Sequence, residues 1–223
     1  MRQILKSVAF FLLSLSVGIG CATRPVASDF AERTALWHEV AAPSVLIRNL
    51  NGGSGSGVVI YQNNRRALVL TAAHVVGDDG AAFVERGDVK YVGTVLRRDV
   101  DVDLALIETL PVWSHVARVV ESDDLRAFGW ASRVVIVGHP LGVEQAHITD
   151  GRITSVNDRG MLRYSAGSFF GNSGGGVFTQ IDGTWALISI AQRIAGGQGV
   201  GPYPLLGRGA HPANLIAFLL GGN

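Results

Sequence analysis

Short apolar segments rich in β-branched residues alternate with polar turn residues along most of this chain. Breakers such as Asn-Gly, Asn-Asn and Asp-Asp-Gly separate the segments, which is typical of short antiparallel strands. A first set of predicted strands covers residues 44–47, 57–61, 67–71, 89–96 and 104–108. A second set covers residues 133–137, 147–156, 160–165, 176–179 and 185–191. The pattern therefore predicts an all-β chain with two groups of strands.

The polar segments between these runs predict how the two groups are connected. Residues 157–160 and 180–183 combine Asn or Asp with Gly, which favours hairpin turns. Residues 110–124 have no strand pattern, and we interpret them as the crossing from the first group to the second.

The first residues carry the pattern of an export signal. A basic start is followed by an apolar stretch, residues 7–19, which is short for a bilayer-spanning helix. Gly20 then precedes Cys21, the single cysteine of the chain, as in a bacterial lipobox. Gly18 stands where a lipobox usually has leucine, so ordinary cleavage after Ala22 stays an alternative.

We therefore expect residues 1–21 to be a signal peptide with Cys21 as its lipidation site, and the protein to be exported to the cell envelope. A lipid anchor would hold it at a membrane of the periplasm or at the outer membrane; otherwise it would be periplasmic or secreted. Residues 22–40 are the expected tether and lead-in segment. Asp29, with Glu32 three residues later, predicts a helix start within this segment.

Three motifs in the body of the chain carry candidate chemistry. Ser173 lies within Gly-Asn-Ser-Gly-Gly, His74 ends the apolar run Leu-Thr-Ala-Ala-His, and Asp103 opens the run Asp-Leu-Ala-Leu. A serine hydroxyl is a weak nucleophile that needs a base, and histidine is a base near neutral pH. A carboxylate behind the histidine fixes its tautomer and stabilises the imidazolium. Glycines let the chain turn sharply, so that the amides of Gly171 and Ser173 could bind an oxyanion.

The order His, Asp, Ser is the order of the double-barrel proteases, and the chain resembles the chymotrypsin-like (trypsin-like) serine proteases, most closely their bacterial HtrA/Deg branch. The residues that carry the resemblance are 55–60, 70–76, 103–107, 134–142, 151–156 and 171–177. The resemblance implies a protease domain over residues 41–223 made of two six-stranded antiparallel β-barrels, at about 41–112 and 128–207, and a short C-terminal helix at about 211–220. It also implies a serine endopeptidase that needs no cofactor, and we expect it to lack the PDZ modules usual in this branch.

The substrate pocket departs from the family pattern. Gly176 stands where the branch usually has proline, and the approach to the nucleophile, residues 166–170, is Ala-Gly-Ser-Phe-Phe. Gly167 takes the place where an aspartate would favour substrates with Arg or Lys before the scissile bond. We expect Ser189, Ile190 and Ala191 to form the pocket wall, and small or medium apolar residues to be preferred.

Two further aspartates compete for the role of the orienting acid. Asp99, Asp101 and Asp103 alternate, so on a strand they would share one face. The resemblance selects Asp103, because Leu-Ala-Leu follows it directly. Asp101 is the alternative.

Composition narrows the classes of function further. A net charge of +1 argues against an obligate nucleic-acid partner, and one cysteine excludes an intramolecular disulfide. The other histidines lack metal-ligand spacing, so no metal site is expected. Protein or peptide substrates are the expected partners. The rival interpretation is a catalytically silent binding or structural protein on the same fold, because fold does not fix function.

Overall fold

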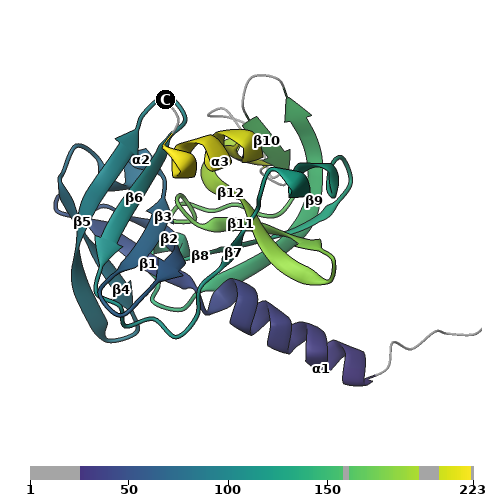
Figure 1. The fold of residues 1–223 in the computed structure, drawn as a ribbon, viewed down its shortest axis with the longest axis horizontal. Helices are drawn as coiled ribbons and strands as arrows, with labels where there is room; N and C mark the ends of the chain where they lie inside the picture. The colour runs from purple at the N-terminus through teal and green to yellow at the C-terminus, as the bar shows by residue number, and fades with distance from the viewer. Residues whose placement is uncertain (1–25, 158–160, 196–205, 222–223) are drawn as a thin grey trace, which may run out of the picture.

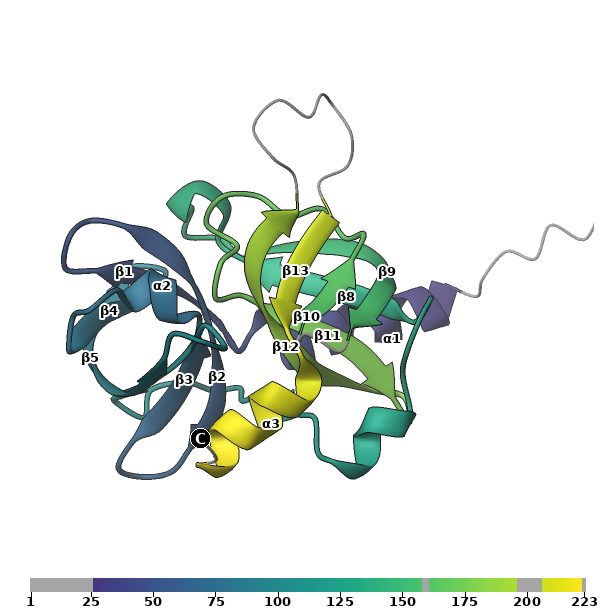
Figure 2. The same ribbon diagram turned by 90° about the horizontal axis from the view of Figure 1, so that it is seen from above.

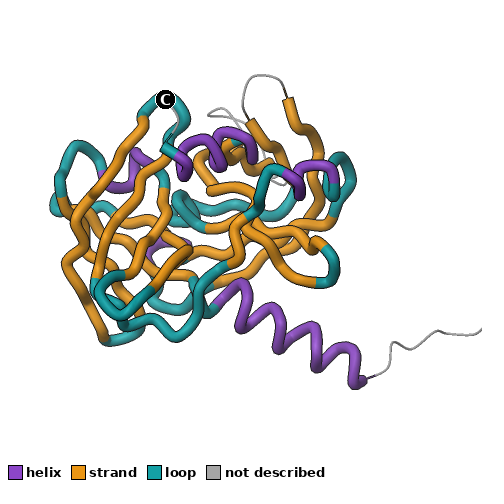
Figure 3. Tube along the Cα trace, in the orientation of Figure 1, coloured by secondary structure: helices purple, strands orange, loops and turns teal. Residues whose placement is uncertain are grey.

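The computed structural model describes residues 26–157, 161–195 and 206–221, which form two β-barrels with their axes in different directions (Figures 1 and 2). The strands are β1 Ser44–Asn49, β2 Ser54–Gln62, β3 Ala67–Thr71, β4 Ala81–Arg86, β5 Val89–Asp99, β6 Leu104–Thr109, β7 Arg118–Val119, β8 Arg133–Gly138, β9 His147–Asn157, β10 Met161–Tyr164, β11 Gly176–Ile181, β12 Thr184–Ala195 and β13 Leu206–Ala210. The helical elements are α1 Val26–Ala35, η1 Leu36–Ala41, α2 Ala73–Val76, η2 Asp123–Arg126, η3 Pro140–Gly142 and α3 Pro212–Leu220. Strand and loop dominate the chain outside α1 and α3 (Figure 3).

The first barrel closes in the order β1-β2-β3-β6-β5-β4, with every pair antiparallel. Alternate residues point into it, because side chains switch faces at each residue of a strand. Val59, Val69 and Ile107, which lie opposite one another on β2, β3 and β6, share one face and are fully buried. These are the β-branched and aliphatic positions that produced the strand pattern in the sequence.

The second barrel runs β11-β8-β9-β10-β13-β12 and closes through pairing of β11 with β12. The two-residue strand β7, within the predicted crossing, adds to β12 in parallel. The turn Asp182-Gly183 has positive φ at both residues, +51° and +81°, as a two-residue hairpin turn requires. This turn and the two-barrel fold are confirmed; the predicted turn at 157–160 lies mostly outside the described residues.

Two strands missing from the sequence prediction complete the barrels. In the first barrel β4 pairs with both β1 and β5, and in the second β13 pairs with both β10 and β12. The bounds of β3 match the prediction, whereas several other strands are longer than predicted; β12, for example, continues to Ala195.

The lead-in segment is helical and begins earlier than expected. Helix α1 starts at Val26, so Asp29 lies inside the helix and is not its N-cap. Residues 26–28, predicted as tether, are the first turn of α1, while Cys21 and the rest of the predicted signal lie outside the described residues. Glu32 binds Arg133 at 2.6 Å, and the Glu39 carboxylate accepts the N–H of Trp185 at 2.7 Å. These contacts attach the segment to the second barrel.

Helix α3 occupies almost the predicted residues and connects the barrels. It follows β13 of the second barrel, yet Arg97 on β5 of the first barrel donates to the carbonyl of Phe218 at 2.7 Å. The Arg97 guanidinium also lies 4.6 Å from the Phe218 ring centroid. Across the described ranges, none of the helices combines the length and apolar character needed to cross a bilayer.

Candidate active site

His74 and Asp103 meet at the edge of the first barrel. His74 lies in the single helical turn α2 directly after β3, and Asp103 lies in the turn between β5 and β6 with φ +54°. The His74 Nδ1 atom is 3.0 Å from Oδ1 and 2.9 Å from Oδ2 of Asp103. The main-chain N–H of His74 also donates to Oδ1 at 3.0 Å. The carboxylate therefore fixes both the ring and the backbone of the histidine.

The neighbouring aspartates have other positions. The Asp99 carboxylate accepts the main-chain N–H groups of Asp101 and Val102, which shapes the turn. Asp101 is exposed and lines a cavity that does not include His74. Of the three alternating acids, Asp103 is the one that contacts His74.

The loop around Ser173 needs its glycines for space and for backbone conformation. Gly171 has φ +95°, and a Cβ on it would lie 2.6 Å from the carbonyl oxygen of His139. Gly174 has φ +84°, and a Cβ there would collide with the carbonyl of Ser56. L residues rarely adopt such φ values, so both positions are restricted to glycine.

The peptide between Phe170 and Gly171 is oriented by a contact outside the loop. The carbonyl of Phe170 accepts the N–H of Leu141 at 2.7 Å. In a trans peptide the N–H points opposite to the C=O, so the N–H of Gly171 points away from Leu141. Among the described residues, no group accepts the N–H of Gly171 or of Ser173. The loop thus presents two unpaired amide donors.

Ser56, on β2 of the first barrel, clamps this loop and was not singled out from the sequence. Its N–H donates to the carbonyl of Ser173 at 2.7 Å, and its Oγ donates to the carbonyl of Gly171 at 2.7 Å. The same Oγ accepts the N–H of His139 at 2.8 Å. Ser56 lies within residues 55–60, one of the segments that resemble the serine proteases, and this is the feature of the sequence that could have indicated its role.

Ser173 lies in the same cavity as His74, but its hydroxyl points elsewhere. Both residues line a cavity of about 440 Å³ with Leu141, Phe170 and Gly171. The Ser173 Oγ donates to the main-chain carbonyl of Gln192 at 3.3 Å rather than to the imidazole.

The predicted pocket wall lies mostly inside the second barrel. Ser189 and Ile190 have no exposed surface, and the Ser189 hydroxyl donates to the carbonyl of Ala210 at 2.6 Å. Ala191 is 3% exposed and exchanges main-chain hydrogen bonds with the loop after Ser173. Gly167 is half-buried, and its carbonyl accepts the hydroxyl of Thr149. Ala191 thus supports the loop that follows Ser173, and the role of Ser189, Ile190 and Ala191 as a pocket wall stays a prediction.

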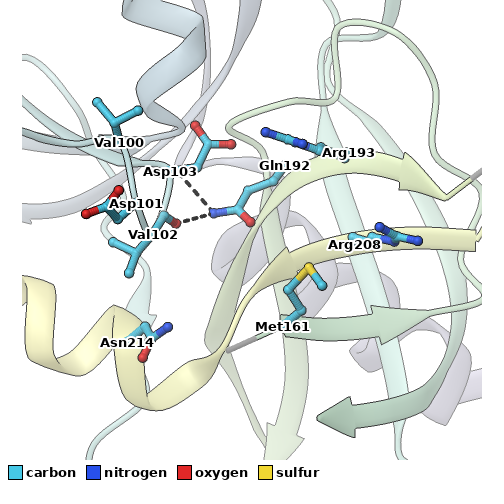
Figure 4. Close-up of a pocket in the computed structure, with 9 residues that line it drawn as sticks. All are labelled: Val100, Asp101, Val102, Asp103, Met161, Gln192, Arg193, Arg208 and Asn214. Carbon is cyan, nitrogen blue, oxygen red and sulfur yellow. Dashed lines mark hydrogen bonds between the residues drawn. The ribbon is translucent and has the colours of Figure 1, made fainter. Parts of the chain in front are cut away.

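The residue that follows them faces the site and was missed. The Gln192 side-chain amide donates to the carbonyls of Val102 at 2.6 Å and Asp103 at 3.0 Å (Figure 4). A register shift between Ala191 and Arg193 changes which residues face outward, and nothing in the sequence indicates that bulge.

Within the described ranges, no three His, Cys, Asp or Glu side chains cluster as a metal would require. His139 is 1% exposed, and burial lowers its pKa below the usual histidine value, against the opposing effect of its bond to the carbonyl of Val143.

Comparison with known proteins identifies the family of this chain. Residues 55–188 match the trypsin-like peptidase domain, so the chain belongs to that family. An HtrA-like serine protease of Staphylococcus aureus strain RF122 is 28% identical over 140 residues, which is 55% of this chain and 18% of the relative. The protein from strain USA300 is 31% identical over 105 residues, 46% of this chain and 14% of the relative. The chain thus spans less than a fifth of the length of these relatives.

Two solved structures share the fold. The serine endoprotease of Yersinia pestis superimposes with a TM-score of 0.69 at 21% identity, covering 85% of this chain and 65% of the other. The inactive form of the Rv3671c protease, a protein of M. tuberculosis, gives a TM-score of 0.65 at 22% identity and covers 86% and 94%. The chymotrypsin-like double barrel is therefore the fold of this chain.

Proposed function

We propose that this chain is a serine endopeptidase in which Ser173 is the nucleophile, His74 the general base and Asp103 the orienting acid. His74 takes the proton of the Ser173 hydroxyl, and the oxygen attacks the peptide carbonyl. The N–H groups of Gly171 and Ser173 stabilise the oxyanion that forms. His74 then protonates the leaving amine, and water releases the acyl group by the same route.

The observation that carries this proposal is the pairing of His74 with Asp103 beside two unpaired amides. Asp103 contacts Nδ1 with both carboxylate oxygens, which leaves Nε2 to act as the base. The loop that holds Ser173 is fixed from the first barrel by Ser56 and from the second by Ala191. Rotation of the Ser173 side chain about its Cα–Cβ bond, away from Gln192, is the movement that would bring its hydroxyl to the imidazole.

Cleavage of casein tests the activity. The wild-type protein should cleave casein, and Ser173→Ala should abolish cleavage while the melting temperature stays close to that of the wild type. Ser122 is exposed, and its side chain forms no helix-capping hydrogen bond. Ser122→Ala is therefore the matched control and should retain activity. Equal cleavage by wild type and Ser173→Ala would refute the assignment of the nucleophile. A folded wild type without activity would favour the rival function, a binding protein.

We further propose that Cys21 is diacylated and anchors the enzyme in the cell envelope. The basic start, the short apolar stretch and Gly20 before the single cysteine support this. Acyl chains contribute about 0.8 kcal/mol per buried methylene to membrane binding. Cys21→Ser should move the protein from the membrane fraction to the soluble fraction with its peptidase activity retained. A soluble wild type whose mature N-terminus is Thr23 would show cleavage after Ala22 instead.

A further inference from the structure

Three arginines lie side by side on adjacent strands of the second barrel. Arg208 on β13 is directly opposite Arg163 on β10 and opposite Arg193 on β12. Residues directly opposite in an antiparallel pair share one face, with Cβ atoms about 5 Å apart. Like charges at that spacing destabilise a sheet. We call these three residues the arginine row.

The arginine row lacks the acids that accompany other arginines of this chain. Over the described residues, no Asp or Glu forms an ion pair with any of the three guanidinium groups, and the Nε atoms of Arg163 and Arg208 are buried without an acceptor. By contrast Arg48, Arg66 and Arg133 each bind a carboxylate within 3 Å.

The undescribed internal stretches cannot supply an excess of acid. Residues 196–205 contain no Asp or Glu, and residues 158–160 are Asp-Arg-Gly. Over the described residues, the arginine row therefore keeps a surplus of positive charge without a bound carboxylate.

A cavity of about 320 Å³ is lined by two members of the arginine row and by Asp103 of the candidate active site (Figure 4). Arg193 and Arg208 line it together with Met161 and Asn214, and Gln192 and Asp103 lie on its active-site side. Asp101 also lines this cavity but pairs with neither arginine, and the Asp103 carboxylate is bound to His74. The space is open to a ligand that brings its own negative charge.

The position of this cavity fixes which part of a substrate it would meet. His74 must protonate the leaving amine, so the leaving part of the substrate passes His74 and the cavity of Leu141 and Phe170, which includes no β12 residue. The acyl part must lie on the opposite side of Ser173, where the Gln192 carbonyl contacts its Oγ. Arg193 follows Gln192 directly, so the arginine row borders the acyl part.

We propose that the arginine row is a substrate-selecting site that binds an acidic side chain two to four residues before the scissile bond. The inference rests on the proposed peptidase function and names its substrate class: polypeptides with Glu or Asp at that distance. Arginine guanidinium groups bind carboxylates through paired charge-assisted hydrogen bonds. A bound carboxylate would neutralise the like charges on neighbouring strands and supply a counter-charge that the described residues do not provide.

Paired peptides test this directly. Quenched fluorescent peptides identical except for Glu or Gln at the second, third or fourth residue before the scissile bond would be compared by kcat/KM. We expect a Glu-to-Gln ratio of about tenfold for at least one position at low salt, since charge-assisted hydrogen bonds are the stronger class. The ratio should fall as salt is raised, because screening weakens partly exposed pairs.

The variant Arg193→Gln/Arg208→Gln should bring that ratio close to one. Arg65→Gln removes the same charge from the exposed turn between β2 and β3 and should keep the wild-type ratio. A wild-type ratio near one at all three positions, or a ratio unchanged in the double variant, overturns the proposal while the peptidase function stands.

A binding measurement separates this proposal from catalysis. The Ser173→Ala protein should bind the Glu peptide more tightly than the Gln peptide by fluorescence anisotropy, and the two Arg→Gln changes added to it should remove the difference. This result would support the arginine row even if no peptide were cleaved, in which case the peptidase function alone fails. Equal binding of the two peptides to Ser173→Ala would overturn the arginine row. The thermal melt of the double variant should show no loss of folding, because the changes remove like charges.

Discussion

Asp103 combines an uncommon backbone conformation with the contacts that fix His74. Its φ of +54° is left-handed, a region that Asp tolerates better than most residues. That conformation turns the carboxylate toward α2, where it meets both Nδ1 and the main-chain N–H of His74. Asp101, two residues earlier, is exposed, and the cavity that it lines does not include His74. The period-two pattern in the sequence could not separate them, because they lie in a turn rather than on one strand face.

The two aspartates should therefore differ in kinetics. Asp103→Asn presents a donor to Nδ1 and stabilises the wrong tautomer, so we expect kcat to fall by about 10⁴-fold, as for this change in a chymotrypsin-type triad. Asp101→Asn should leave kcat within about threefold of the wild type, because the substitution removes only an exposed charge. Peptide hydrolysis by the two purified variants checks this ranking, and the reverse order would transfer the role to Asp101.

Ser56→Ala tests the clamp on the oxyanion loop. The change leaves the Gly171 carbonyl without its hydroxyl donor and the His139 N–H without its acceptor. We expect kcat to fall about 10- to 100-fold and the free energy of unfolding to fall by about 1–3 kcal/mol, because a buried polar group loses its partner. Ser122→Ala is again the control. Wild-type kcat in Ser56→Ala would show that the loop keeps its shape without the clamp.

Among the secondary-structure elements, β13 was missed in the sequence because two of its residues are glycines. β13 contains Gly207, where a Cβ would collide with the ring of Tyr164, and Gly209, where it would collide with the Ser189 hydroxyl. Close packing requires glycine at both places, and glycine weakens any strand pattern. β4 has the sequence Ala-Ala-Phe-Val-Glu-Arg, so its only large apolar residues are Phe83 and Val84, and they give a weak strand pattern. The strand bounds that were predicted well, such as Ala67–Thr71, belong to runs of large apolar residues.

A substitution in the arginine row should raise the stability of the protein, whereas most substitutions lower it. Arg163→Gln removes one of two directly opposite cations on β10 and β13. We expect the melting temperature to rise by about 1–3 °C, since a like-charge cross-strand pair costs about 0.2–1 kcal/mol. Thermal melts at low and high salt measure this, and the gain should shrink as salt screens the row. A lower melting temperature at low salt would mean that Arg163 has a stabilising contact.

His139, between β8 and η3, should couple stability to pH. Burial lowers the pKa of His139 in the folded protein, while the unfolded chain titrates near pH 6.5. Below that pH the unfolded state binds a proton that the folded state resists, so the free energy of unfolding falls as the pH drops through 6.5.

In His139→Gln we expect a smaller fall between pH 8 and pH 5.5, measured by denaturant titration at both values. The pKa of His115 is lowered too, by burial first and then by His38 and Arg86, so part of the fall should persist. An equal or larger fall in His139→Gln would contradict the assignment.

At the scale of the whole molecule, the candidate site exists only where the two barrels meet. His74, Asp103 and Ser56 come from the first barrel, and Ser173 and Gln192 come from the second. His74, Asp103 and Ser173 could be predicted from the sequence because each lies in a short motif of neighbouring residues. Gln192 and Ser56 act through contacts between the barrels, and Ser189 and Ile190 turned out to be buried. Such long-range placement depends on strand register, which composition and periodicity do not encode.

Reaction with a fluorophosphonate, followed by intact mass and peptide mapping, measures whether Ser173 is an activated nucleophile. We expect one adduct per chain, located on Ser173, absent in Ser173→Ala and strongly reduced in His74→Ala, because the serine needs its base. Ser122→Ala should label like the wild type. Absence of labelling in folded wild-type protein, or an adduct on another serine, would show that Ser173 is not the activated nucleophile.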